Sequence, residues 1–231
     1  MPIAFDKNLA EGNHGTGTWT TTGTLNIATG VFVVVGVGFA TGSTPVVTDL
    51  AGNTYTGRTA YSGAAVAVRL FYAYNVTGNA AMTWTVTGTG ILASMAIMSF
   101  SGVNTASDPY DKESGSTYFA TTPATPGAFT PTNDNSLVVS FLSHNNTSPA
   151  FACASFTIKD QVALSGGSNY GVCSAYVIQT SKASVNASWS DTSGNQGGVN
   201  QANFDAPGGG PAFLPREQYL IMQAVNRASR F

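Results

Sequence analysis

The segment from Val31 to Phe39, VFVVVGVGF, constrains the fold more than any other, because both of its alternating faces are apolar. Successive side chains of a strand point to opposite faces, so a strand of this kind needs an apolar layer on each side. The segment is too short to cross a membrane as a helix, and Gly36 and Gly38 disfavour a helix in water. We therefore expect a central strand, with the rest of the chain packed beside it and across from it.

Other segments carry the same kind of signal. Side chains alternate from Ala65 to Asn75 and from Met82 to Thr87, whereas Ser94 to Phe100 and Ser136 to Leu142 are again apolar on both faces. Weaker strand patterns cover residues 17–27, 151–158, 172–178, 185–189 and 219–225. The prolines in 104–133 leave no room there for a helix of useful length. These patterns predict an all-β protein, an antiparallel β-sandwich of the jelly-roll-like type.

The strand patterns also recur within the chain. Val31–Gly36 is similar to Ser136–Phe141, and Trp84 is similar to Trp189 at the same separation. Two copies at so large a spacing do not form a solenoid. We expect one sandwich domain over residues 1–231, with pseudo-repeat halves at about 16–103 and 121–228. Two tandem sandwiches of immunoglobulin size are the alternative.

Two segments look irregular and suited to docking on neighbouring subunits. Residues 1–15 are predicted to form an arm, and residues 192–217 an extended loop rich in Gly and Pro. A structureless segment of that length is unusual in a compact domain unless it is ordered against a partner. Its apolar residues are the predicted interface: Phe204, Phe213, Leu214 and Pro215.

Charged residues make up only 9% of the chain, against about 25% in an ordinary soluble protein. The net charge is −2 and no basic cluster occurs, which argues against nucleic acid as a partner. No apolar run has the length of a membrane span, and the start, MPIAFDK, does not have the pattern of a secretory signal. A composition typical of extracellular proteins without an export signal favours a virion protein released by lysis. A mature secreted fragment that begins with a new Met is the alternative.

The candidate catalytic residues are few. His14 and His144 are predicted to lie in exposed loops, and neither belongs to a nucleophile motif. The acidic group Asp108, Asp111 and Glu113 is interpreted as a solvated turn rather than a glycosidase pair. Calcium at this group, or at Asp49 with Asn53, is a weaker hypothesis than turn capping. We therefore predict no catalytic residue, no metal, no cofactor and no enzymatic activity.

Cysteines and aromatic residues supply the remaining candidates. Cys153 and Cys173 fall in predicted strands and are interpreted as buried thiols, with a disulfide between them left open. Trp84 and Trp189 share faces with apolar residues and are predicted to lie in the core. The tyrosines in loops or at strand ends are freer to stack on sugars or to anchor an interface; they are Tyr55, Tyr61, Tyr110, Tyr118 and Tyr170. Tyr110 and Tyr118 are added to the predicted interface.

Four stretches together resemble a known family: DLAGNTYT at Asp49–Thr56, FYAYN at Phe71–Asn75, TWTVT at Thr83–Thr87 and the stretch Ser99–Asp111. The family comprises β-sandwich domains, jelly-roll or immunoglobulin-like, of phage structural proteins and bacterial surface proteins. The resemblance implies a non-enzymatic module for adhesion, decoration or fibre building, and the short N-terminal segment is more similar to the phage members. The segment 192–217 departs from the family's short connection.

Together these observations predict a structural protein of a phage virion. It would be a capsid decoration or cement protein, or another surface protein of head or tail, that forms a homo-oligomer and packs against other virion proteins. The alternative is a carbohydrate-binding or adhesion module of a tail fibre or bacterial surface protein, with a glycan as its partner.

Overall fold

The structure is a computed structural model that describes residues 1–12, 16–88, 90–119, 123–167, 169–190 and 196–208. The elements in these ranges are all β-strands, with no helix among them, and all of the strand pairings are antiparallel. This confirms the predicted all-β sandwich. In the same ranges no helix is long and apolar enough to span a membrane.

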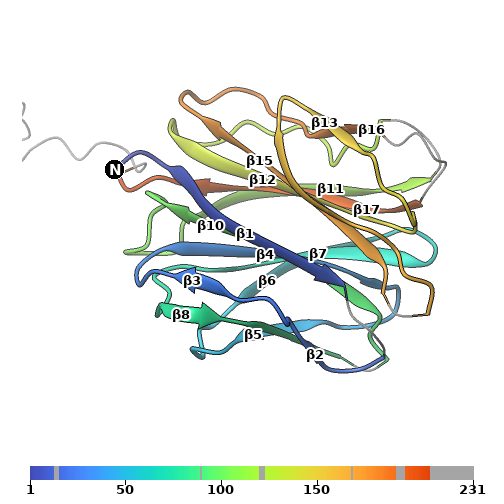
Figure 1. Cartoon of the computed structure of the whole chain (residues 1–231). Helices are drawn as coiled ribbons and strands as arrows, with labels where there is room; N and C mark the ends of the chain where they lie inside the picture. The colour runs from blue at the N-terminus through green and yellow to red at the C-terminus, as the bar shows by residue number, and fades with distance from the viewer. Residues whose placement is uncertain (13–15, 89, 120–122, 168, 191–195, 209–231) are drawn as a thin grey trace, which may run out of the picture.

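Two five-stranded sheets pack face to face at the centre of the molecule (Figure 1). The first sheet has the order β1 (Ala4–Gly12), β10 (Ala93–Ser101), β4 (Phe32–Ala40), β7 (Val66–Ala73) and β6 (Thr56–Ser62). The second sheet has the order β11 (Tyr110–Phe119), β17 (Gln196–Asp205), β12 (Ser136–His144), β15 (Gly171–Gln179) and β14 (Thr157–Val162). Each sheet is built from one half of the chain. The internal repeat in the sequence stays a prediction.

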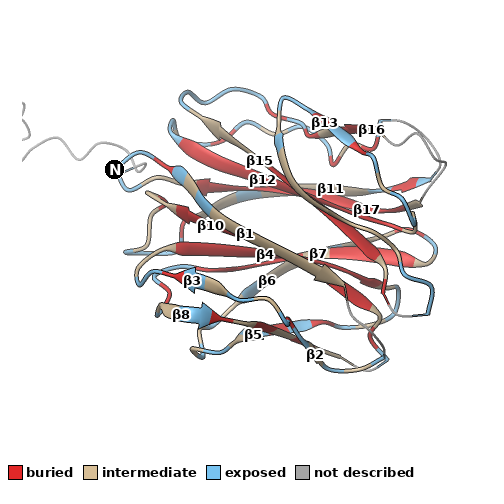
Figure 2. Cartoon of the chain, viewed as in Figure 1, coloured by how far each residue is buried: buried red, intermediate tan, exposed pale blue. Residues whose placement is uncertain are grey.

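Short strands add an outer layer on each side, so that the molecule has four layers (Figure 1). The outer face of the first sheet is covered by β2 (Trp19–Thr20), β9 (Trp84–Thr87), β5 (Val46–Asp49), β3 (Leu25–Ile27) and β8 (Asn79–Met82). The outer face of the second sheet is covered by β13 (Ala152–Ala154) and β16 (Ser188–Ser190). One apolar core lies between the sheets and one lies under each outer layer. The central strands are therefore buried on both faces (Figure 2).

This layering explains the doubly apolar pattern of β4. Val33, Val35 and Val37 enter the core under the outer layer, whereas Phe32 and Val34 enter the core between the sheets. The two predicted core tryptophans, Trp84 of β9 and Trp189 of β16, are each 0% exposed in the cores between the outer layers and the sheets, as expected.

The predicted N-terminal arm is wrong for residues 4–12, which form β1 along the edge of the first sheet. Phe5 of β1 stacks on Tyr176 at 5.3 Å between ring centroids and meets the edge of Phe100 at 5.7 Å. Charged residues on this exposed edge, and a register shift between Phe5 and Lys7, hide the alternation in the sequence. The segment is thus part of the sandwich itself.

The predicted loop 192–217 is also wrong over 196–205, which form β17, a buried inner strand of the second sheet. A Cβ at Gly197 or Gly198 would overlap the carbonyl oxygen of Ser143 or Tyr61, so the glycines permit close packing rather than a loop. Buried polar side chains at Asn200, Gln201 and Asn203 obscure the apolar pattern. Residues 209–217, with Phe213, Leu214 and Pro215, and the predicted strand 219–225 lie outside the described residues.

Residues 104–133 contain a strand that the proline-rich pattern did not predict. This strand, β11, runs along the edge of the second sheet and pairs with β17. Its residues are mostly polar and half-buried, which is typical of an edge strand but gives no apolar alternation.

Candidate functional site

The predicted exposed position of His144 is wrong. His144 ends β12, is 0% exposed and packs against the ring of Phe151 at 4.9 Å between centroids. Its Nδ1 accepts a hydrogen bond from the backbone N–H of Asn146 at 3.1 Å. The strand continues two residues beyond the apolar run that ends at Leu142, and the His144 side chain therefore lies in the interior. His14 lies outside the described residues.

The acidic residues at the start of β11 each stabilise local structure. Asp108 accepts hydrogen bonds from the Tyr72 hydroxyl and the Tyr110 backbone N–H. Asp111 accepts from the backbone N–H and hydroxyl of Thr132. In the described part of the chain, no group of three or more His, Cys, Asp or Glu residues could hold a metal ion.

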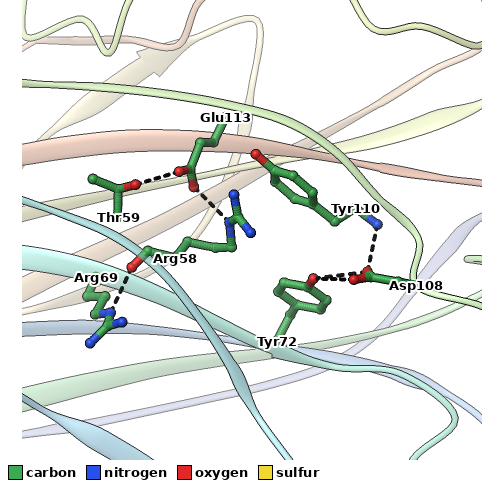
Figure 3. Close-up of polar contacts among 7 residues, drawn as sticks. All are labelled: Arg58, Thr59, Arg69, Tyr72, Asp108, Tyr110 and Glu113. Carbon is green, nitrogen blue, oxygen red and sulfur yellow. Dashed lines mark hydrogen bonds and ion pairs between the residues drawn. The ribbon is translucent and has the colours of Figure 1, made fainter.

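The third acidic residue, Glu113, links β6 at one edge of the first sheet to β11 at one edge of the second (Figure 3). We call such a contact between the edges of the two sheets a lateral seam. Glu113 of β11 accepts from the Arg58 guanidinium of β6 at 3.0 Å and from the Thr59 hydroxyl at 2.6 Å. The Arg58 guanidinium lies 3.6 Å from the centroid of the Tyr110 ring. Burial, and then the Asp108 carboxylate, raise the pKa of Tyr72 well above its ordinary value. The contacts of Arg58 and Thr59 with Glu113 join β6, an edge of the first sheet, to β11, an edge of the second.

The opposite lateral seam joins β1 to β14. Asn8 donates to the Asp160 carboxylate at 2.9 Å, and the Lys159 ammonium lies 3.7 Å from the centroid of the Phe5 ring. Desolvation by burial raises the pKa of the Asp160 carboxyl, and the hydrogen bonds from Asn8 and Ser174 oppose this rise. The carboxyl of Asp205 also has a raised pKa, again chiefly because of burial.

These raised pKa values predict how stability depends on pH. A carboxyl whose pKa is higher in the folded than in the unfolded chain, where it is about 3.9, binds its proton more tightly when folded. Its contribution is fully present below the unfolded-state pKa and is lost as the pH rises through the folded-state pKa. We expect Asp160→Asn to remove part of this fall in the free energy of unfolding, as measured by urea titrations between about pH 3 and pH 7. Asp205→Asn should remove a separate part of the same fall in the free energy of unfolding. An unchanged pH slope in Asp160→Asn would contradict the prediction.

The turn after β5 is capped by Asp49, as the spacing of Asp49 and Asn53 predicted. Asp49 accepts from the Asn53 backbone N–H at 3.0 Å, from the Asn53 amide at 2.8 Å and from the Tyr55 hydroxyl at 3.0 Å. Tyr55 in turn accepts from the Trp84 indole N–H at 2.7 Å. Burial, and then the Asp49 charge, raise the pKa of Tyr55 well above its ordinary value. The Tyr55 side chain is therefore held inward by its hydrogen bonds and is not placed to stack on a ligand.

The other tyrosines considered from the sequence are also engaged in packing. Tyr118 lies near the end of β11, is buried and donates to the Ser143 carbonyl at 2.9 Å, so its predicted place in an exposed interface is wrong. Tyr110 is half-buried in the seam, and the Tyr61 ring packs on Gly115. Tyr170 is half-buried.

The remaining predicted site residues are placed as follows. Phe204 is 0% exposed in the core between the sheets, not on an exposed loop. Cys153 in β13 of the outer layer and Cys173 in β15 beneath it are buried thiols, as the strand pattern predicted, and no disulfide joins them.

Among the described tyrosines, only Tyr74 is exposed, at 37%. The sequence pattern placed it in an alternating strand, but β7 ends at Ala73 and Tyr74 turns outward. Asn75 follows with φ of 51°, a left-handed conformation that asparagine tolerates well. An aromatic residue followed by asparagine at the end of a strand was the signal that could have located this position.

Tyr74 lies at the rim of a pocket of about 450 Å³, which we call the Tyr74 pocket. Its lining is uncharged and comes from the turn after β5, the start of β6 and the end of β7: Gly52, Asn53, Thr54, Thr56, Ala73, Tyr74 and Asn75. One exposed ring beside amides and hydroxyls can stack on a flat ligand face and hydrogen-bond to its edge.

A second pocket, of about 370 Å³, lies where β1 approaches β14. It is lined by Glu11, but the Glu11 carboxylate already accepts from the backbone N–H groups of Thr22 and Gly23. Its other polar wall, Asn169, donates to the Ser94 hydroxyl and to the carbonyl oxygen of Ala163. The side chains of Glu11 and Asn169 therefore hold chain segments together at this pocket.

Comparison with known proteins gave no match to a family model, to a curated protein or to a solved structure. The resemblance to β-sandwich domains of phage and bacterial surface proteins therefore stays a prediction.

Proposed function

We propose that the protein is a non-enzymatic structural protein of a phage particle, on the outer surface of its head or tail. The proposal rests on the contacts of the acidic side chains near the start of β11, which bind other parts of the fold. Asp108, Asp111 and Glu113 serve the fold, by anchoring loops and closing a seam, rather than sharing a cleft.

The composition supports the same proposal. With 9% charged residues, copies of the chain repel one another weakly, which favours dense packing on a particle. The two closed seams support it as well, because they join the edges of the sheets and make a rigid block. In this proposal the segment that contains Phe213, Leu214 and Pro215 contacts neighbouring subunits of the particle.

The location is tested on particles produced by the genome that encodes the chain. Gold-labelled antibodies against the protein are expected to decorate intact heads or tails in electron micrographs, and mass spectrometry of purified particles should find the chain. Particles that lack the chain, together with abundant free protein in the same lysate, would overturn the proposal.

The contact segment is tested separately by a variant of the full chain. Replacing Phe213, Leu214 and Pro215 together by alanine is expected to lower the occupancy of particles by about tenfold or more, since buried apolar anchors dominate most interfaces. Phe119→Ala is the matched control, because Phe119 is an exposed apolar residue, at 51%, outside this segment of the sequence. If the variant occupies particles as fully as the unaltered chain, this segment is not part of the interface.

A further inference from the structure

We propose that the Tyr74 pocket is a carbohydrate site that takes a pyranose ring of a neutral glycan. This inference goes beyond the structural role proposed above and does not depend on it, since it rests on the pocket alone.

The Tyr74 ring supplies the apolar part of the recognition. Tyr74 is 37% exposed and lines the pocket, whereas Tyr55, on the turn after β5, is held inward by Asp49 and Trp84. A pyranose presents a face of C–H groups that packs on an aromatic ring, while its hydroxyls remain at the edge. An exposed ring of this kind fits a sugar better than it fits a wholly apolar ligand, because the surrounding wall is polar.

The polar groups beside the ring suit hydroxyls. The side chains of Tyr74, Asn75 and Thr54 form no hydrogen bond with any residue that the structure describes. Their polar groups can therefore pair with a ligand. The Asn75 amide offers both donors and an acceptor, as a hydroxyl requires. Because none of the lining residues is charged, a neutral sugar is favoured over a sulfated or acidic one.

The wall of the pocket is also held rigid. Asn53 donates to Asp49 and to the Thr77 carbonyl, and its own side-chain oxygen accepts from the Thr77 backbone N–H at 2.7 Å. These bonds tie the turn after β5 to the segment after β7, on the two sides of the pocket. A preformed site loses less conformational freedom on binding, and the volume of about 450 Å³ lies within the range of small-molecule sites.

The experiment uses the full chain and two steps. The chain is first applied to an array of immobilised neutral and sialylated glycans. It is then titrated, by saturation-transfer NMR and calorimetry, with the methyl glycosides of glucose, galactose and N-acetylglucosamine and with the best neutral glycan of the array. We expect binding to neutral glycans, with no gain from sialic acid.

Variants locate the site. Tyr74→Ala is expected to weaken binding by about two- to tenfold, and Tyr74→Phe, which keeps the ring, by less than about twofold. Asn75→Gly removes the amide while accommodating the positive φ, and it should weaken binding by a similar factor to Tyr74→Ala. Phe119→Ala is the matched control and should leave affinity unchanged. Thermal unfolding of each variant shows whether the fold is intact.

Two results would overturn the inference: no binding of any neutral glycan or glycoside, or binding that Tyr74→Ala leaves unchanged in a folded variant. Glycan binding by a protein that is missing from particles would contradict only the proposed structural role. Presence on particles without glycan binding would contradict only the inference drawn here.

Discussion

Gly36→Ala is expected to lower the free energy of unfolding by about 3 kcal/mol, the upper end for overpacking in a core. A Cβ at Gly36 would overlap the ring of Phe141, which belongs to β12 of the facing sheet and is 0% exposed. Because the ring lies in the close-packed core between the two sheets, it has no empty space to enter. Urea unfolding of the purified variant measures the effect.

The contact itself is tested by a double-mutant cycle. Phe141→Leu replaces the ring by a smaller side chain and destabilises the protein alone, but in the Gly36→Ala background it should cost less, with a coupling energy of about 1 kcal/mol or more. Gly166→Ala is the control, since a Cβ at Gly166 meets nothing within 4 Å. If Gly36→Ala unfolds at the same urea concentration as the unaltered chain, the close approach of β4 and β12 is wrong.

Gln201→Leu is expected to lower the free energy of unfolding by about 2–5 kcal/mol, because it leaves several buried groups without partners. Gln201 is 0% exposed in β17. Its oxygen accepts from the Ala187 backbone N–H at 2.9 Å, and its amide donates to the carbonyl oxygens of Gly127 at 2.9 Å and Val185 at 3.2 Å. This one side chain therefore holds two segments of the outer layer onto the second sheet.

Loss of those bonds should also loosen the outer layer locally. Hydrogen exchange of the Ala187 amide is expected to accelerate in Gln201→Leu beyond the change that global destabilisation explains. Gln179→Met is the control, because the side-chain oxygen of Gln179 is buried and has no hydrogen-bond partner among the described residues. A Gln201→Leu variant as stable as Gln179→Met would show that the buried amide contributes nothing.

Several features were predictable because they depend on short-range patterns. The apolar runs at β4, β10 and β12 predicted central strands, and the alternation at Trp84 predicted an inward tryptophan. The Asp49 turn was predictable because an aspartate and an asparagine four residues apart cap a turn locally.

The failures share one cause, which is that the missed elements have no local apolar signal. β17 is buried but carries Asn200, Gln201 and Asn203, whose polar groups are satisfied or enclosed by segments far away in the chain. β1 and β11 are edge strands, so half-burial suffices for them and charged residues are tolerated. The Tyr74 pocket was missed because it forms from three segments that meet only in the fold.

The order of apolar and polar side chains along the chain was enough to determine that this protein consists of stacked antiparallel sheets, since burial on one face leaves a period of two and burial on both faces leaves a short continuous apolar run. Tertiary packing alone decided which strands lie at the edges, which polar side chains are buried and which tyrosine reaches solvent. Those outcomes depend on partners far apart in sequence, as when Glu113 meets Arg58 across two sheets, and no local pattern encodes them.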